Sequence, residues 1–225
     1  MTGGGQRDSG ASRRERKKAE TRSRIVESAT ALFLERGYDA TTLLEITERA
    51  DVASRTFYLH FRSKADVALA RFQDWFEDFM AALGTVPEEA GLRELLQETL
   101  GHLQLKGYAS GIRLRDPSGR PIPPVVAALL LSESHAEIAG RFYQLKVEAL
   151  RRLASFFEQR FGYDPASVEP YIIASALLAA WTVAIYGFGH LAQATDDPPA
   201  PDELSVASLT AYLEGIETLA RRRTR

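Results

Sequence analysis

The sequence predicts an all-α protein, in which an N-terminal three-helix domain is joined by a linking helix to a larger helical domain, with about nine helices. Apolar residues recur three or four positions apart in most segments, which is the spacing of a helix with one buried face. Caps and stops such as Gly37, Thr42 and Ser63 separate these segments. The alternation typical of strands is not found along the chain, so we expect no sheet.

Composition places the chain among globular proteins. It has 225 residues, of which 45% are hydrophobic, enough for one sizeable core or two modest ones. Cysteine is absent, which excludes disulfides and cysteine metal sites and is typical of a reducing compartment. No apolar run is long enough for a membrane span, and the N-terminus is charged where a signal peptide is apolar. We therefore expect a cytoplasmic protein with no metal, no cofactor and no membrane partner.

Charge is distributed unevenly along the chain. Residues 1–71 carry 14 Lys and Arg against 10 Asp and Glu, whereas the remainder carries 14 against 20. Within residues 1–24 the ratio is 8 to 3. A basic head on an acidic body indicates an anionic partner for the head, although a solvated charged tail would have the same composition.

The N-terminal segment combines a charged arm with an amphipathic helix. Residues 1–18 have no apolar periodicity and are expected to form a disordered basic arm. From Lys18 to Arg36, apolar positions 25, 29, 32 and 33 form one buried face. Gly37 then provides a left-handed stop. The predicted three-helix domain covers residues 19–64, and residues 65–225 form the larger domain.

Two short helices follow within residues 41–64. Thr42 and Glu45 have the spacing of a capping box, and apolar positions 43, 46 and 50 continue that helix for two turns. Residues 51–53 form a tight break, after which Ser54 is expected to cap a helix that ends near Phe61. Phe57 and Phe61 are four apart and should face inward, which leaves most of the other side chains of this helix outward.

Longer helices are predicted for the rest of the chain. Their expected ranges are 63–83, 88–106, 125–161, 165–194 and 202–223, with residues 107–124 breaking the pattern around a turn at Asp116–Gly119. Residues 165–194 are apolar around most of the helix circumference, so this helix must be covered on nearly every face.

The short pair of helices has the geometry of a helix-turn-helix, whose second helix enters the major groove of DNA. Its outward side chains suit that partner. Arg55 can pair with guanine, Leu59 can contact a thymine methyl group, and the others are donors for phosphate or base edges. The candidate DNA-binding residues are Thr42, Ser54, Arg55, Thr56, Tyr58, Leu59, His60 and Lys64. An ordinary helical hairpin without a nucleic-acid partner is the alternative.

The segment from Thr41 to Lys64, TTLLEITERADVASRTFYLHFRSK, preceded by ALFLERGY at 31–38, resembles the TetR family of transcriptional regulators over residues 20–72. The resemblance implies phosphate contacts for Thr42, Thr56, Tyr58, His60 and Lys64, and groove-facing positions for Ser54, Arg55 and Leu59. Asp51 departs from the pattern, because the family usually has glycine there; Asp tolerates the turn conformation better than most residues.

The same resemblance implies an all-helical homodimer that binds a near-palindromic double-stranded operator and responds to a small-molecule effector, with repression as the expected sign. The last two long helices would pair across the two-fold axis, through Leu177, Trp181, Leu209, Leu213 and Ile216. A purely intramolecular core is the alternative for these helices. An effector-independent DNA-binding dimer is the alternative for the function.

Candidates for lining an effector pocket are mostly aromatic: Trp75, Phe79, Leu103, Tyr108, Phe142, Tyr143, Trp181 and Tyr186, with His102, His135 and His190 as polar groups nearby. Each is also a plausible plain core residue. The stretch TFYLHFRSKADV and the arginines at 113, 115 and 120 are similar to a branch of the family with acyl-CoA-like ligands. Three arginines in a proline-rich loop are also often simply solvated.

A helical enzyme is a remote alternative. Glu133, Ser134 and His135 could be drawn as a catalytic cluster, but adjacent residues on a helix point apart. The four histidines have no metal-binding spacing, and the chain has no phosphate-binding glycine motif.

Overall fold

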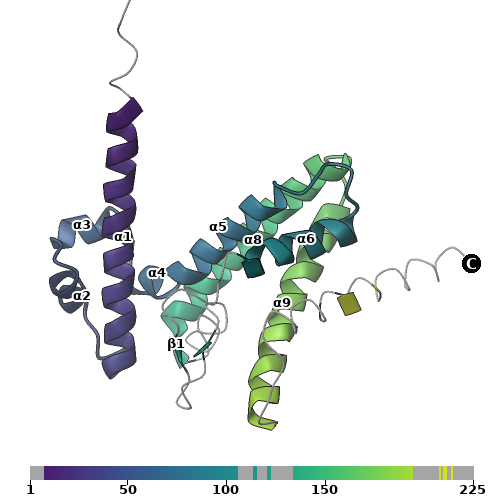
Figure 1. The fold of residues 1–225 in the computed structure, drawn as a ribbon. Coiled ribbons are helices and arrows are strands. Elements are labelled where there is room, and N and C mark those ends of the chain that lie inside the picture. Colours follow the sequence, from purple (N-terminus) through teal and green to yellow (C-terminus); the bar gives the residue numbers. More distant parts are fainter. Residues whose placement is uncertain are drawn as a thin grey trace, which may run out of the picture. The chain divides into compact units, whose positions relative to one another are not determined.

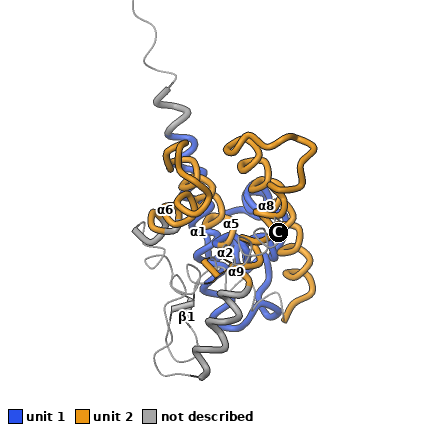
Figure 2. The backbone as a smooth tube through the Cα atoms, turned by 90° about the vertical axis from the view of Figure 1, so that its right-hand side faces the viewer, with its two compact units in different colours: residues 1–71 blue, residues 72–225 orange. Residues whose placement is uncertain are grey.

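The computed structural model describes residues 8–105, 114–115, 121–122 and 134–194, together with residues 208, 210, 211 and 214. The chain divides into two compact units, residues 1–71 and residues 72–225 (Figure 2).

The first unit contains α1 (Asp8–Arg36), α2 (Leu43–Arg49), α3 (Ser54–Tyr58) and α4 (Lys64–Ala68), with the shorter helices beside the long α1 (Figure 1). The core of this unit contains the residues that the sequence predicts to face inward, and the partly buried Leu43 and Val52 pack against it. Two ion pairs of 2.7 Å, Arg36–Glu45 and Arg49–Glu35, join α1 to α2. The buried core residues are Ile25, Val26, Ala29, Leu32, Ile46, Ala50, Phe57, Phe61, Val67 and Ala70.

Helix α1 begins at Asp8, inside the range 1–18 that the sequence predicts as a disordered arm. Residues 13–20 are all exposed, so no buried face supports this part of the helix. Arg, Lys, Glu and Ala are good helix formers without burial. An ion pair between Arg16 and Glu20, at 3.7 Å, adds i,i+4 support. The expectation of disorder is therefore wrong for residues 8–18. The buried residues of α1 begin at Ile25, and the helix propensity of the residues before them extends the helix towards the N-terminus.

Capping follows the sequence closely in this unit, with one exception. Gly37 takes the left-handed conformation, with φ of 87°, and so does Asp51, with φ of 51°. The capping box of Thr42 and Glu45 is formed. Ser54 is not a cap: Ala53 occupies the N-cap of α3 without a side-chain hydrogen bond, and Ser54 is the first helical residue.

The first unit extends beyond the predicted boundary at residue 64. Ser63 caps α4 as expected, accepting from the backbone N of Asp66 at 3.1 Å. The helix predicted for 63–83 is interrupted at Leu69, whose backbone leaves helical geometry, so α4 and α5 (Ala70–Leu83) are separate. Val67 and Ala70 belong to the first core, which places the end of the unit at Arg71.

The second unit contains α5 after Arg71, α6 (Leu92–Leu105), α8 (Ala136–Phe161) and α9 (Glu169–Ala194) (Figure 1). All four contribute to one core, in which α8 packs against α9. The largest fully buried side chains include Phe79, Leu95, Leu153 and Phe157. The Arg152 guanidinium donates two hydrogen bonds to the Glu77 carboxylate, which joins α8 to α5.

Two helices of this unit start later than predicted, and a third predicted start is not among the described residues. Helix α6 starts at Leu92 rather than 88. Helix α9 starts at Glu169 rather than 165, because Asp164 closes a turn by accepting from the backbone N of Ala166 at 2.7 Å. The expected start at 125 lies outside the described residues. Of the last helix, 202–223, only positions 208, 210, 211 and 214 are described, and all are helical.

The expectation of no strands needs a small correction. Two-residue strands β1 (Leu114–Arg115) and β2 (Pro121–Ile122) pair antiparallel, with Leu114 opposite Ile122. Strands this short have no visible alternation in sequence. The turn predicted at 116–119 lies outside the described residues, and the fold class remains all-α. Among the described helices, none has the length and apolarity that a membrane crossing requires.

Candidate nucleic-acid interface

Helix α3 ends at Tyr58 rather than near Phe61 as predicted, and two aromatic side chains, one in the helix and one three residues after it, anchor this segment. Phe57 is 0% exposed and Phe61 is 4% exposed, and their ring centroids are 5.7 Å apart. On the outer side, Tyr58 is 59% exposed and Leu59 is 71% exposed. Ser54 and Arg55 are also exposed, while Thr56 and His60 are half-buried. The inward and outward positions predicted for this helix are confirmed.

The break between α2 and α3 is held by backbone hydrogen bonds and one apolar side chain. The N–H of Asp51 donates to the carbonyl of Glu48 at 3.1 Å, and that of Val52 donates to the carbonyl of Thr47 at 3.0 Å. Val52 packs against the core of the unit. Because Asp51 adopts the left-handed turn that glycine usually supplies, the departure from the family pattern leaves the turn intact. Helix α3 is thereby fixed relative to α2.

Thr42 is bonded within its own cap. Its hydroxyl accepts from the backbone N of Glu45 at 3.3 Å and donates to the Glu45 carboxylate at 2.7 Å, and its own N–H donates to that carboxylate at 2.8 Å. The hydrogen bonds from Thr42 and the nearby Arg36 guanidinium lower the pKa of Glu45. Glu45 therefore remains ionised, which keeps the start of α2 rigid.

Lys64 holds the loop between α1 and α2 against α4. Its ammonium donates to the backbone carbonyls of Tyr38 at 2.8 Å and Thr41 at 3.0 Å, and lies 4.0 Å from the centroid of the Tyr38 ring. A lysine ammonium has three N–H donors, so one is left beyond these two carbonyl bonds. The sequence placed Lys64 among the DNA-facing residues but missed this structural role, because Tyr38 and Lys64 are distant along the chain.

His60 lies where α3 meets α1. Burial, together with the positive charges of Lys18 and Arg22, lowers the pKa of His60 from its ordinary value of 6.5. The guanidinium carbon of Arg22 lies 5.2 Å from the centroid of the Phe61 ring. Cationic residues of α1 therefore sit beside the end of α3. Sequence reasoning predicted a helix from Lys18 to Arg36 and an anionic partner for residues 1–24, but it did not show that Lys18 and Arg22 lie beside His60 and Phe61, because these residues are distant along the chain.

The candidate effector-binding residues that the structure describes are divided between core and surface. Phe79 is fully buried and stacks on Trp75 at a centroid distance of 5.8 Å. Phe142 is 5% exposed and meets Phe72 edge-on at 5.0 Å. Tyr143 is 66% exposed and does not lie with them. Tyr108 is outside the described residues, and so are the side chains of Leu103, Trp181 and Tyr186, whose backbones are helical.

The polar candidates of the second unit are not brought together within the described residues. His102 Nδ1 lies 3.2 Å from the hydroxyl of Thr85. His135 occupies the N-cap of α8 without a side-chain cap bond. Three positions (Arg113, Arg120 and Glu133) lie outside the description, and Arg115 and His190 are described only as backbone. No cluster of three metal-ligating side chains occurs in the described part of the chain.

The predicted dimer contacts need one correction. Leu177 is 1% exposed within its own chain, where it belongs to the core of the second unit. A side chain already removed from water has little left to bury against a partner. The exposed apolar side chains of the same segment are Val168, Tyr171 and Ile172. The side chain of Trp181 and residues 209, 213 and 216 lie outside the description.

Comparisons with known proteins identify the first unit and extend into the second. A family model described as "Bacterial regulatory proteins, tetR family" matches residues 25–70. The HTH-type transcriptional repressor DhaR of Mycobacterium sp. (strain GP1) is 33% identical over 174 residues, which cover 73% of this chain and 80% of DhaR. The HTH-type transcriptional regulator TcmR of Streptomyces glaucescens is 43% identical over 74 residues, so the match spans 33% of each chain.

The fold agrees with these matches. A crystal structure of a TetR-family transcriptional regulator from Syntrophomonas wolfei aligns with a TM-score of 0.57 and 20% identity, covering 86% of this chain and 93% of the other. Since these relatives are transcription regulators, the alternative of a helical enzyme is set aside. The match to DhaR extends across both units, and α3 buries an aromatic side chain while it exposes its outer face. The chain therefore belongs to the TetR family of bacterial transcriptional regulators.

Proposed function

We propose that this protein is a ligand-responsive repressor, which binds a near-palindromic DNA operator as a homodimer and is released by a small-molecule effector. The observation that carries the DNA-binding part is the outer face of α3, where Tyr58 and Leu59 are exposed directly beside the buried Phe57 and Phe61. Large apolar or aromatic side chains on an exposed helix face mark an interaction site when the helix itself is firmly anchored. Repression is favoured by DhaR, which is named as a repressor.

The roles of the individual side chains follow from their chemistry. Ser54, Arg55 and Leu59 read base edges in the major groove, because they lie on or beside the exposed side of α3. Phosphate contacts come from the donors around this face, with Lys64 using the donor that its two carbonyl bonds leave. The proposed phosphate-contacting residues are Thr42, Thr56, Tyr58, His60 and Lys64, and a contact from Thr42 requires it to release one of the hydrogen bonds that it donates to Glu45.

The dimer forms through α9 and the last helix. Val168, Tyr171 and Ile172 expose 64%, 48% and 53% of their surface at the start of α9, and this apolar face is suited to a second copy. Trp181, Leu209, Leu213 and Ile216 remain candidates for the same interface. A two-fold dimer presents two copies of α3 to successive major grooves, about 34–36 Å apart, which is why a near-palindromic operator is expected.

The effector that we propose is a small molecule, hydrophobic or acyl-CoA-like, that enters the second unit. Phe72, Phe79 and Phe142 are already buried, so the half-buried Trp75 is the member of this aromatic cluster that we expect to contact such a ligand. An effector-independent dimer is the second candidate, and it predicts that no such ligand changes DNA affinity.

Selection of bound fragments from a random DNA pool tests the DNA-binding part directly. We expect a two-fold symmetric consensus, with half-sites about one helical turn apart. The variant Arg55→Ala with Tyr58→Ala should lose this enrichment, while Arg151→Ala, an exposed change on α8, should keep it. Enrichment of no sequence by the wild-type protein, at any salt concentration, would refute the proposal.

A further inference from the structure

We propose that a basic row on α1, formed by Arg14, Lys18 and Arg22, binds the sugar–phosphate backbone of the operator outside the footprint of the helix-turn-helix. This inference rests on the proposed DNA-binding function and extends it to a second surface. It assigns a task to residues 13–22, which lie ahead of the buried part of α1.

The three cations lie on the side of α1 that faces the rest of the unit. Residues four apart share a helix face, so positions 14, 18 and 22 form one row. The row continues into Ile25 and Val26, which are 0% and 2% exposed in the core. At 1.5 Å per residue, the row is about 12 Å long. It is thus an exposed continuation of the face that packs on the shorter helices.

The row meets the end of α3 at Arg22. The guanidinium of Arg22 lies over the ring of Phe61, 5.2 Å from its centroid. Lys18 and Arg22 are close enough to His60 for their charges to contribute to lowering its pKa. Positive charge therefore extends from the residues that follow α3 onto α1, next to the surface proposed to bind DNA, so one duplex backbone could contact both.

Folding does not explain why this row is cationic. Arg14 and Lys18 are exposed, and like charges four apart on a helix destabilise it. Glu15 lies on the same face, three positions before Lys18, and offsets part of this repulsion, but the row with Glu15 still carries a net charge of +2. A polyanion placed along the row would remove this repulsion. The arrangement is therefore better suited to the DNA-bound protein than to the free one.

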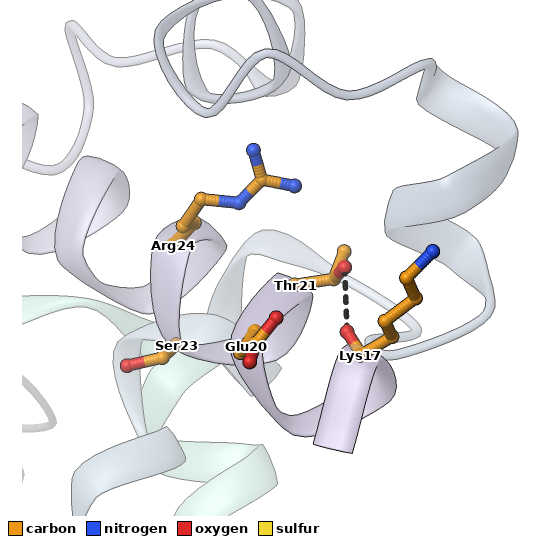
Figure 3. A pocket seen from close by; sticks show the side chains of 5 residues that line it. All are labelled: Lys17, Glu20, Thr21, Ser23 and Arg24. Carbon is orange, nitrogen blue, oxygen red and sulfur yellow. Dashed lines mark hydrogen bonds between the residues drawn. The ribbon is translucent and has the colours of Figure 1, made fainter. Parts of the chain in front are cut away.

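The flank of α1 next to this row has a different character. Lys17, Glu20, Thr21 and Arg24 lie along it beside an open hollow of about 690 Å³ (Figure 3). Glu20 pairs with Arg16 on this part of the helix, and the Thr21 hydroxyl donates to the carbonyl of Lys17 at 2.9 Å. The acidic Glu20 and its ion pair with Arg16 interrupt the positive charge on this flank. This flank provides matched control positions on the same helix.

Double-stranded DNA fits the row better than a membrane surface does. Helices that bind bilayers combine basic residues with a face of large apolar side chains. Between positions 13 and 24 the only apolar residue of α1 is Ala19. The exposed large apolar residues of the first unit, such as Leu34 and Leu44, lie elsewhere. Charge without an apolar face is typical of phosphate-backbone contacts.

The test compares two double variants of the full-length chain, Arg14→Gln with Lys18→Gln, and Arg13→Gln with Lys17→Gln. Both remove two positive charges from exposed positions of the same helix, and Gln is a good helix former. Affinity for the selected operator is measured against salt concentration, on a long duplex and on a duplex trimmed to the selected consensus. Circular dichroism and light scattering verify that the variants are folded and have the wild-type mass.

We expect the 14/18 variant to lower the slope of log affinity against log salt by about 1.8 on the long duplex, which is two phosphate contacts. The 13/17 variant should change the slope by much less. On the trimmed duplex, the wild-type protein and the 14/18 variant should converge. Equal slopes for the two variants on the long duplex would overturn the inference while leaving the proposed function standing, since the wild-type protein still binds its operator. A wild-type protein that binds no selected DNA refutes the proposed function itself.

Discussion

Replacing Lys64 with Met tests the most connected side chain of the DNA-binding unit. The ammonium of Lys64 donates to two backbone carbonyls at 2.8 and 3.0 Å and contacts the ring of Tyr38. Methionine keeps most of the aliphatic length but removes the charge and all three donors. The change therefore separates the polar contribution of the side chain from its packing.

The expected loss of stability comes from these contacts. Hydrogen bonds from charged donors contribute about 1.5–3 kcal/mol each, but a partly exposed carbonyl can regain water. The contact with the ring adds about 0.5–1 kcal/mol. Taking the lower end for the two hydrogen bonds, and setting the ring contact against the water that the carbonyls regain, we expect the first unit to lose about 3 kcal/mol.

Amide hydrogen exchange measures this loss without requiring both units to unfold together. The backbone N–H groups of Ile46 and Phe57 are hydrogen-bonded within α2 and α3 and should report opening of the first unit. A loss of about 3 kcal/mol corresponds to exchange roughly 100-fold faster. The exposed change Lys17→Met is the control and should leave these rates unchanged.

DNA binding by the same variant separates the two roles of Lys64. If the third donor contacts a phosphate, the salt slope falls by about 0.9 in addition to the loss of stability. Exchange rates within twofold of the wild-type values would refute the structural role. Faster exchange with an unchanged salt slope would instead refute the phosphate contact.

Three further predictions concern other parts of the molecule. Arg55→Ala should cost about 1–3 kcal/mol on the selected operator and much less on random DNA, measured by competition binding; equal losses on both would exclude base readout. His60 has a lowered pKa, so it should not affect the stability of the free protein above pH 6.5 but should destabilise it as the pH falls below that value. Phosphate favours the charged form of His60, so DNA affinity should rise on acidification from about pH 7.5 to about pH 6, and less so for His60→Gln; parallel pH profiles would argue against this contact. Ile172→Asp should weaken the dimer in sedimentation experiments, whereas Leu177→Ala should lower the free energy of unfolding by about 2–5 kcal/mol; a shift in dimer affinity for Leu177→Ala alone would contradict its place in the core.

Local signals in the sequence predicted much of the first unit. The capping box at Thr42, the stop at Gly37 and the inward pair Phe57 and Phe61 are all present, because each depends on residues within one or two helical turns. Asp51 shows the same principle, since a single residue in the left-handed region makes the turn. The N-cap of α3 was predicted wrongly. Serine is a good N-cap residue, so Ser54 was expected there, but Ala53 is the N-cap and Ser54 is the first residue of the helix.

Long-range contacts were less predictable. The carbonyls that Lys64 binds lie more than 20 residues earlier in the chain, and no periodicity relates them. The boundary of the first unit was placed too early for the same reason, since Val67 and Ala70 join a core whose other members come from α1 to α3. Leu177 was assigned to a dimer because its helix is apolar around most of its surface, and hydrophobicity does not reveal which neighbour covers a given side.

The sequence by itself determined the helical class, the inward and outward sides of α3, and the family, because these depend on the spacing of residues within short segments. Tertiary structure decided which charged and apolar side chains are already engaged by their own chain. It placed Lys64 on two carbonyls, Leu177 in the core, and Arg22 against Phe61 beside His60. These assignments depend on distances between residues that are far apart in the chain, and such distances are set only when helices pack into one core.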